Sequence, residues 1–209
     1  MNVLLVFVIL LNFVLLGSSR MRSLIRTTAL QGFLLASMPI FVHEHGGFRI
    51  YALSILAMAI KAAIIPTLLF RAMREVNIRR EVEPILGYVP SLLLGALGTG
   101  IAIVYADRLP LAPQHAGTLI LAGSFSTMWT GFIILTTRLK AITQVIGYLI
   151  LENGIFLFGL LLLEAMPALV ELGALLDLFV GVFVMGIILN HIQRTFSSLD
   201  TTRLAQLKD

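Results

Sequence analysis

The sequence lacks cysteine altogether and is poor in charged residues. Without cysteine the chain cannot form disulfides, and it cannot supply thiolates to zinc, to an iron–sulfur cluster or to nickel. Only 12% of the 209 residues are charged, whereas an ordinary globular domain has about 25%. Hydrophobic residues make up 58%. This composition excludes an ordinary soluble domain. The net charge of +4 does not indicate nucleic-acid binding, because the basic residues lie between apolar runs.

Long apolar runs separated by short basic loops predict an all-α polytopic membrane protein with about seven transmembrane helices. Each run is close to the roughly 20 residues that a helix needs to cross about 30 Å of hydrocarbon. The first run has no basic residue before it, and Arg20 and Arg22 follow it, so we expect an uncleaved helix and not a signal peptide. The expected spans are 2–19, 24–42, 50–71, 86–105, 116–136, 142–164 and 169–191.

The basic residues predict the orientation of these helices. If the N-terminus lies outside, twelve lysines and arginines fall on the cytoplasmic side, and only Arg49 and Arg108 fall on the outer side. Such an excess of basic residues is typical of cytoplasmic loops. We therefore expect an outer N-terminus and a cytoplasmic C-terminus. The cytoplasmic set is Arg20, Arg22, Arg26, Arg71, Arg74, Arg79, Arg80, Arg138, Lys140, Arg194, Arg203 and Lys208.

Three ionisable residues lie well inside apolar spans: Lys61 in the third, Glu152 in the sixth and Asp177 in the seventh. At a rise of about 1.5 Å per residue, Lys61 and Glu152 lie about 15 Å from the cytoplasmic ends of their spans, and Asp177 about 21 Å. All three therefore fall near one mid-membrane depth. A charge at that depth costs about 2.5–3.5 kcal/mol, so these groups must face one another, a neighbouring subunit or water.

Two hypotheses account for these three residues. In the first they form a proton relay, since buried carboxyl groups with a cation nearby can exchange protons within the membrane. In the second, Lys61 forms an ion pair with Asp177 or Glu152 that only fastens the bundle. Three groups cannot all pair one to one, and this favours the relay.

Neighbouring residues extend the predicted relay. Gln144, Tyr148 and Glu152 are spaced by four residues, which predicts one polar stripe from the cytoplasmic rim to the acid. Pro66 follows Lys61 by five residues, and it predicts a kink that frees a backbone carbonyl in the same half of the membrane.

Other positions predict packing and not chemistry. Gly123, Thr127 and Gly131 share a four-residue spacing, which is typical of a close helix–helix face. We find no nucleophile paired with a base and no phosphate-binding loop, and we read His43-x-His45 as part of a solvated loop. The sequence therefore predicts no catalytic, metal or cofactor site on this chain.

The chain also shows signs of internal duplication. "RMRSLIR" before the second span matches "RLKAITQ" before the sixth at an offset of 118, and Lys61 and Asp177 hold equivalent places at an offset of 116. Four spans separate the two starts, so the repeats are parallel. We predict a three-helix unit at 1–75, a cytoplasmic loop with a connecting helix at 76–110, and a second three-helix unit with a short tail at 111–209.

Several stretches resemble a known family. "QVIGYLILENGIFLFGLLLL", "ELGALLDLFVGVFVMGIIL", "LDTTRLAQLKD" and "AIKAAIIP" look like component E, a membrane subunit of hydrogenase-4 and formate-hydrogenlyase-type complexes. From about residue 138 onward the chain is also similar, more distantly, to subunit K of complex I and the C subunit of multisubunit cation/proton antiporters. Subunit K carries two intramembrane glutamates. Asp177 falls at the place of the second, and Glu152 lies about one helical turn from the first. Lys61 resembles the channel lysines of antiporter-like subunits.

This resemblance implies a non-catalytic subunit of a group 4 [NiFe]-hydrogenase-type complex in a prokaryotic cytoplasmic membrane. Its implied partners are antiporter-like membrane subunits, a membrane protein like the H subunit of complex I, and peripheral [NiFe]-hydrogenase-like subunits. The nickel–iron centre and the iron–sulfur clusters would then lie on those partners. The mid-membrane residues would contribute to a lateral proton path.

Two other functions fit the same sequence. The chain is a structural subunit that holds antiporter-like modules together if its charges are locked in permanent pairs. It is a stand-alone secondary transporter if it works without partners, although short loops and no evident substrate cavity suit a docking subunit better. The ion carried is a proton or sodium.

Overall fold

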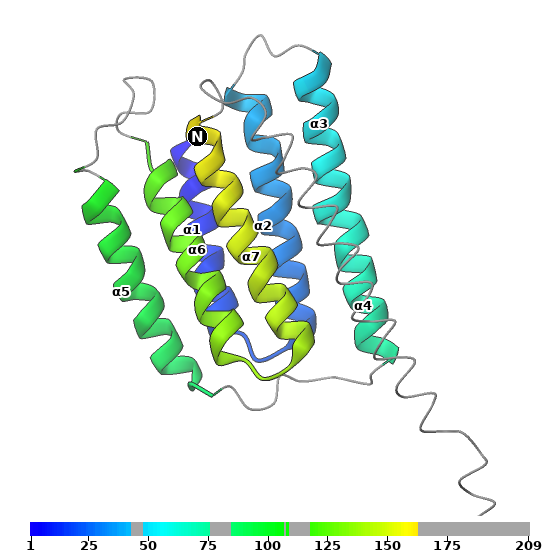
Figure 1. Ribbon diagram of the computed structural model, residues 1–209, viewed down its shortest axis with the longest axis vertical. Helices are drawn as coiled ribbons and strands as arrows, with labels where there is room; N and C mark the ends of the chain where they lie inside the picture. Colours follow the sequence, from blue (N-terminus) through cyan, green and yellow to red (C-terminus); the bar gives the residue numbers. More distant parts are fainter. Residues whose placement is uncertain (43–47, 76–84, 107, 109–117, 163–209) are drawn as a thin grey trace, which may run out of the picture.

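The computed structural model describes residues 1–42, 48–75, 85–106, 108 and 118–162, and the regular structure of these residues is helical (Figure 1). This confirms the predicted all-α class. The α-helices are α1 (Asn2–Gly17), α2 (Met21–Val42), α3 (Phe48–Ala59), α4 (Ile65–Glu75), α5 (Tyr88–Ala106), α6 (Ile120–Thr137) and α7 (Ala141–Gly159). A π-helical turn, η1 (Ile60–Ile64), joins α3 to α4, and a short 3₁₀ turn, η3 (Leu160–Leu162), follows α7.

Six of the predicted spans correspond to described helices, with α3, η1 and α4 forming one of them. Within the described residues, five helical stretches are long and apolar enough to cross a membrane, and Asn2–Gly17 is a shorter apolar helix. The chain is therefore a polytopic membrane protein. The seventh predicted span, 169–191, lies outside the described residues together with Asp177. The count of seven, the parallel repeat and the unit boundaries stay predictions.

Several helix ends differ from the predicted span limits. The third predicted span ended at residue 71, but the helix continues to Glu75, and α2 begins at Met21 and not at residue 24. Helical hydrogen bonding does not stop where the hydrocarbon ends, so a hydropathy limit and a helix limit need not coincide. The fifth predicted span began at residue 116, whereas α6 begins at Ile120.

Successive helices run in alternating directions through the bundle (Figure 1). α6 packs against α7, α5 and α1, and α2 packs against α3, α7 and α1. α5 lies at one edge of the described bundle, and α3 and α4 lie at the opposite edge. The ends of α1, α4 and α6 lie at the same end of the bundle as the starts of α2, α5 and α7. The orientation of this end relative to the membrane stays a prediction.

Glycines bring α6 and α7 into backbone contact. A Cβ atom added at Gly147 would lie 2.6 Å from the backbone nitrogen of Leu135 and 3.1 Å from the carbonyl oxygen of Gly131. One added at Gly154 would lie 2.6 Å from the backbone nitrogen of Met128. The small-residue face predicted around Gly131 is therefore confirmed as a close packing face.

Arg138 lies between α6 and α7 and contacts the end of α1 and the start of α5. Its side chain is buried, and its Nη2 donates a hydrogen bond of 3.1 Å to the carbonyl oxygen of Leu16 in the last turn of α1. Its guanidinium carbon lies 4.9 Å from the centre of the Tyr88 ring, at the start of α5. A cation at a helix C-terminus and over an aromatic ring is stabilising. Arg138 therefore joins three parts of the bundle in addition to its predicted role as a topology signal.

We expect Arg138→Met to lower the free energy of unfolding by about 2–3 kcal/mol, because it removes a charged hydrogen bond and a cation–π contact. Thermal denaturation in mild detergent would measure this. Arg22→Met is the matched control, because Arg22 is exposed at the same end of the bundle, and it should change stability by less than about 0.5 kcal/mol. Equal effects of the two changes would contradict the role given to Arg138.

Candidate functional site

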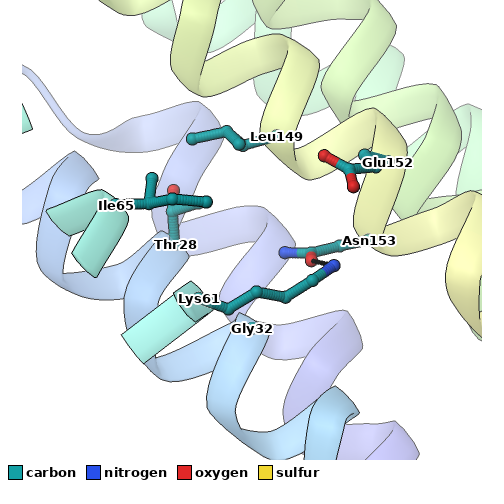
Figure 2. A pocket seen from close by; sticks show the side chains of 7 residues that line it. All are labelled: Thr28, Gly32, Lys61, Ile65, Leu149, Glu152 and Asn153. Carbon is teal, nitrogen blue, oxygen red and sulfur yellow. Dashed lines mark hydrogen bonds between the residues drawn. The ribbon is translucent and has the colours of Figure 1, made fainter. Parts of the chain in front are cut away.

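A small buried cavity lies between α2, the π-helical turn with the start of α4, and α7. It is lined by Thr28, Gly32, Lys61, Ile65, Leu149, Glu152 and Asn153 (Figure 2). Lys61 and Glu152, predicted from the sequence to share one depth, therefore share one cavity. Their exposed fractions are only 7% and 5%.

The π-helical turn places Lys61. Ile65 donates its backbone N–H to the carbonyl oxygen of Ile60, five residues back, so this turn is wider than an α-helical one. Pro66 follows immediately and has no N–H with which to continue the usual pattern. The distortion predicted near Lys61 from Pro66 thus takes the form of a π-helical turn. Such turns are frequent at functional sites.

Lys61 reaches α7 by passing over a glycine of α2. A Cβ atom added at Gly32 would lie 3.0 Å from the Cβ of Lys61 and 3.4 Å from its Cδ, so the missing side chain leaves room for the lysine stem. The Nζ of Lys61 donates a hydrogen bond of 3.0 Å to Oδ1 of Asn153 (Figure 2). It also lies 5.1 Å from the centre of the Phe156 ring, within the range of a cation–π contact.

Glu152 lies one residue before Asn153 on α7 and contributes its carboxylate to the same cavity. Its Oε2 atom is buried and has no hydrogen-bond partner among the described residues. The same holds for Oγ1 of Thr28, on the α2 side of the cavity. Two buried oxygen atoms without partners in one cavity are unusual, since buried polar groups in proteins are nearly always hydrogen-bonded.

A line of buried amides runs from Lys61 into the bundle. Nδ2 of Asn153 donates to Oε1 of Gln31 on α2 at 3.4 Å, and Nε2 of Gln31 donates to Oδ1 of Asn12 on α1 at 2.7 Å. We call Asn153, Gln31 and Asn12 the amide array. All three side chains are buried, and each belongs to an apolar helix.

Hydroxyl groups continue the amide array to the far edge of the bundle. Nδ2 of Asn12 lies 3.0 Å from Oγ1 of Thr127 and 3.3 Å from Oγ of Ser126, both on α6. Oγ of Ser126 is hydrogen-bonded at 2.8 Å to Oγ1 of Thr99 on α5. Buried hydrogen bonds thus connect the helix of Lys61 successively with α7, α2, α1, α6 and α5.

The three amides of the array are oriented in the same sense, and a protonated Lys61 determines that orientation. An ammonium group has three donors and no acceptor, so Asn153 must present its oxygen to Lys61 and its NH₂ group to Gln31. Gln31 and Asn12 then follow in the same sense, each accepting on the side of Lys61 and donating on the far side. Every amide oxygen therefore points toward the cation, which stabilises the buried charge.

The structure separates the other predicted site residues from this cavity. Gln144 is exposed, and its Nε2 donates to the carbonyl oxygen of Arg138, while Tyr148 is 36% exposed. Neither lines the cavity with Glu152. Asp177 lies outside the described residues.

Sequence reasoning missed the amide array and Gly32. Asn12, Gln31 and Asn153 each lie inside an apolar span, where an amide needs a buried partner, and this was the available signal. Gly32 had no signal in the sequence, because its role depends on a lysine from another helix.

The fold and the cavity place the chain in a class: polytopic membrane proteins that bury a lysine and a glutamate together inside the helix bundle. The chain is 33% identical over 194 residues to "Uncharacterized protein Rv0085" of Mycobacterium tuberculosis. The aligned region covers 90% of this chain and 87% of that protein. The chain belongs to the same family as that protein.

A second group of relatives has a functional name. The chain is 29% identical over 155 residues to hydrogenase-4 component E of Escherichia coli, across 73% of this chain and 70% of that one, and the Shigella flexneri protein of that name gives the same values. This homology supports the component E family predicted from the sequence. No family model matches the chain, and no solved structure matches it significantly. The more distant likeness to subunit K of complex I stays a prediction.

Proposed function

We propose that this chain is a membrane subunit of a hydrogenase-type energy-converting complex, in which Lys61 and Glu152 contribute to a lateral proton path. The homology to hydrogenase-4 component E supports the complex. The observation that carries the proton path is that Lys61 and Glu152 line the same cavity. Asp177 belongs to the proposed path on the sequence pattern alone.

Electrostatics explains why this pair suits proton transfer. Each charge at mid-membrane depth costs about 2.5–3.5 kcal/mol. If a proton moves from the lysine to the glutamate, both charges disappear together, so the charged and neutral forms of the pair differ less in energy than those of either group alone. A cavity with one group of each sign can therefore alternate between the two forms.

The amide array does not extend this path in our proposal. Neutral Asn and Gln side chains donate and accept hydrogen bonds but do not readily release a proton. Their role is to hold the Lys61 ammonium in place and to stabilise its charge. The proton would therefore pass through the cavity, and not along the amides towards α5.

The proposed partners lie on both sides of this subunit. Antiporter-like membrane subunits and a protein like the H subunit of complex I would continue the path within a prokaryotic cytoplasmic membrane. Peripheral [NiFe]-hydrogenase-like subunits would carry the redox centres, since this chain has no cysteine to ligate them. The N-terminus would lie outside, according to the distribution of basic residues.

The Glu152→Gln change tests the path. Glutamine keeps nearly the same shape and hydrogen-bonding capacity but cannot ionise, so proton pumping should fall at least about a hundredfold while the complex still assembles. Glu152→Asp should keep part of the pumping. The measurement is proton uptake by inverted vesicles driven by the redox reaction of the complex, with the yield of complex followed in parallel.

Two results would count against the proposal. Normal yield with normal pumping in Glu152→Gln would exclude Glu152 from the path. Poor yield of the complex would instead favour the structural subunit, because removing one member of a locked buried pair costs about 3–5 kcal/mol.

A further inference from the structure

Two polar atoms of the cavity need a partner that the described side chains do not supply. Oε2 of Glu152 and Oγ1 of Thr28 are buried without a hydrogen bond in the described part of the chain. Leaving a buried polar group unsatisfied is unfavourable, and for a charged carboxylate it is more so. Both atoms belong to residues that line the same cavity, on opposing helices α7 and α2.

The size and lining of the cavity match one water molecule. Its volume is about 10 Å³. This is the least space that holds a single water, which also needs two to four polar partners. The lining offers four polar groups: the Thr28 hydroxyl, the Lys61 ammonium, the Glu152 carboxylate and the Asn153 amide (Figure 2). The remaining lining residues, Gly32, Ile65 and Leu149, offer no polar side chain.

We propose that this cavity binds one water molecule, which bridges Glu152 to Lys61 and is held by Thr28. In this position the water accepts a hydrogen bond from the ammonium and donates one to the carboxylate. The second water hydrogen, or the remaining lone pair, forms a hydrogen bond with the Thr28 hydroxyl, which can accept or donate. The two buried oxygen atoms are then both satisfied.

The bridging water also supplies the proton step, a point that rests on the proposed function. Lys61 gives one proton to the water oxygen while the water gives one of its own protons to Glu152. The water is regenerated, the ammonium becomes a neutral amine, and the carboxylate becomes a neutral carboxylic acid. No other reactant is needed, and the reverse transfer restores both charges.

Thr28 and Gly32 are positioning residues in this account, and neither exchanges a proton. Thr28→Val removes the hydroxyl while keeping the shape of the side chain. Gly32→Ala adds a methyl group to the wall of the cavity, against the stem of Lys61. Thr136→Val is the matched control, since Thr136 is an exposed threonine whose hydroxyl donates to its own helix at the carbonyl oxygen of Phe132.

The test combines electron cryo-microscopy of the whole complex in lipid nanodiscs with proton pumping in vesicles. The wild-type map should show one ordered water within about 2.7–3.2 Å of the Glu152 carboxylate and a second lining group. Thr28→Val should lose this density and pump about fivefold more slowly, the loss expected for one hydrogen bond. Gly32→Ala should lose both density and pumping, and Thr136→Val should lose neither.

The outcomes separate this inference from the proposed function. A wild-type map without water in the cavity, together with normal pumping that depends on Glu152, would overturn the water site and leave the proton path standing. Normal pumping in Thr28→Val without the density would overturn the bridging role of the water, and normal pumping with the density retained would overturn the positioning role of Thr28. If Gly32→Ala does not assemble, Thr28→Val alone decides between these results. Glu152→Gln with normal pumping would overturn the proposed path itself.

Discussion

Replacing Gly147 with alanine should destabilise the bundle by about 3 kcal/mol, a large effect for one methyl group. The added Cβ would lie 2.6 Å from the backbone nitrogen of Leu135 and 3.0 Å from its Cα. These are backbone atoms of α6, so no side chain can rotate away to make room. The helices α6 and α7 must move apart, and the contacts along their interface weaken. Thermal denaturation in mild detergent, together with the yield of folded protein, would measure the loss.

Gly100→Ala is the matched control for Gly147→Ala. Gly100 lies inside α5, and a Cβ atom there would have no neighbour within 4 Å in the described structure. Alanine is also the better helix former, so this change should leave stability unchanged or raise it slightly. Gly154→Ala should behave like Gly147→Ala, because its Cβ would meet the backbone of Met128. A Gly147→Ala variant as stable as Gly100→Ala would show that α6 and α7 do not cross as closely as described.

The close crossing of α6 and α7 also matters for the site. α7 carries Glu152 and Asn153, and α6 carries Ser126 and Thr127 at the far end of the amide array. Hydrogen bonds weaken as the donor and acceptor move apart beyond about 3.2 Å. A shift of α7 away from α6 would therefore lengthen the hydrogen bonds that connect Asn153 on α7 with Ser126 and Thr127 on α6 through the amide array. The glycines support function only through this positioning.

The helical fold could be predicted because it depends on properties that are local in the sequence. An apolar run of about 20 residues indicates a membrane span whatever its neighbours are. The shared depth of Lys61 and Glu152 was also predictable, because a constant rise of about 1.5 Å per residue converts sequence position into depth. The structure bears this out for the two residues, since they line one cavity.

The side-chain contacts of the site could not be predicted, because they depend on how the helices rotate and pack against one another. Gln144 and Glu152 are eight residues apart, so at 3.6 residues per turn their directions differ by about 80°. This drift is enough to leave Gln144 exposed while Glu152 is buried. Likewise, nothing in the sequence indicates that Lys61 bonds to Asn153, since that contact requires Gly32 to lie beneath the lysine stem.

The second large effect concerns Asn153, which links Lys61 to the amide array. Asn153→Leu should lower the free energy of unfolding by about 3 kcal/mol, because it removes a hydrogen bond to a buried ammonium and leaves Gln31 without its donor. Gln144→Leu is the matched control on the same helix. Gln144 is exposed, so losing its amide should cost no more than about 1 kcal/mol.

The double variant Lys61→Met with Asn153→Leu separates stability from function. Methionine removes the charge that Asn153 solvates, and two apolar side chains can replace a buried polar pair at little cost. We therefore expect the double variant to be about 2 kcal/mol more stable than Asn153→Leu alone, so the losses caused by the two single changes are not additive, as is typical of residues in direct contact. Proton pumping should nevertheless be lost, because the double variant has no ammonium to exchange a proton with Glu152.

Thermal denaturation of Lys61→Met, Asn153→Leu and the double variant would measure stability, and pumping in inverted vesicles would measure function. Additive losses of stability would show that Asn153 does not hold the charge of Lys61, and retained pumping in the double variant would remove Lys61 from the proton path.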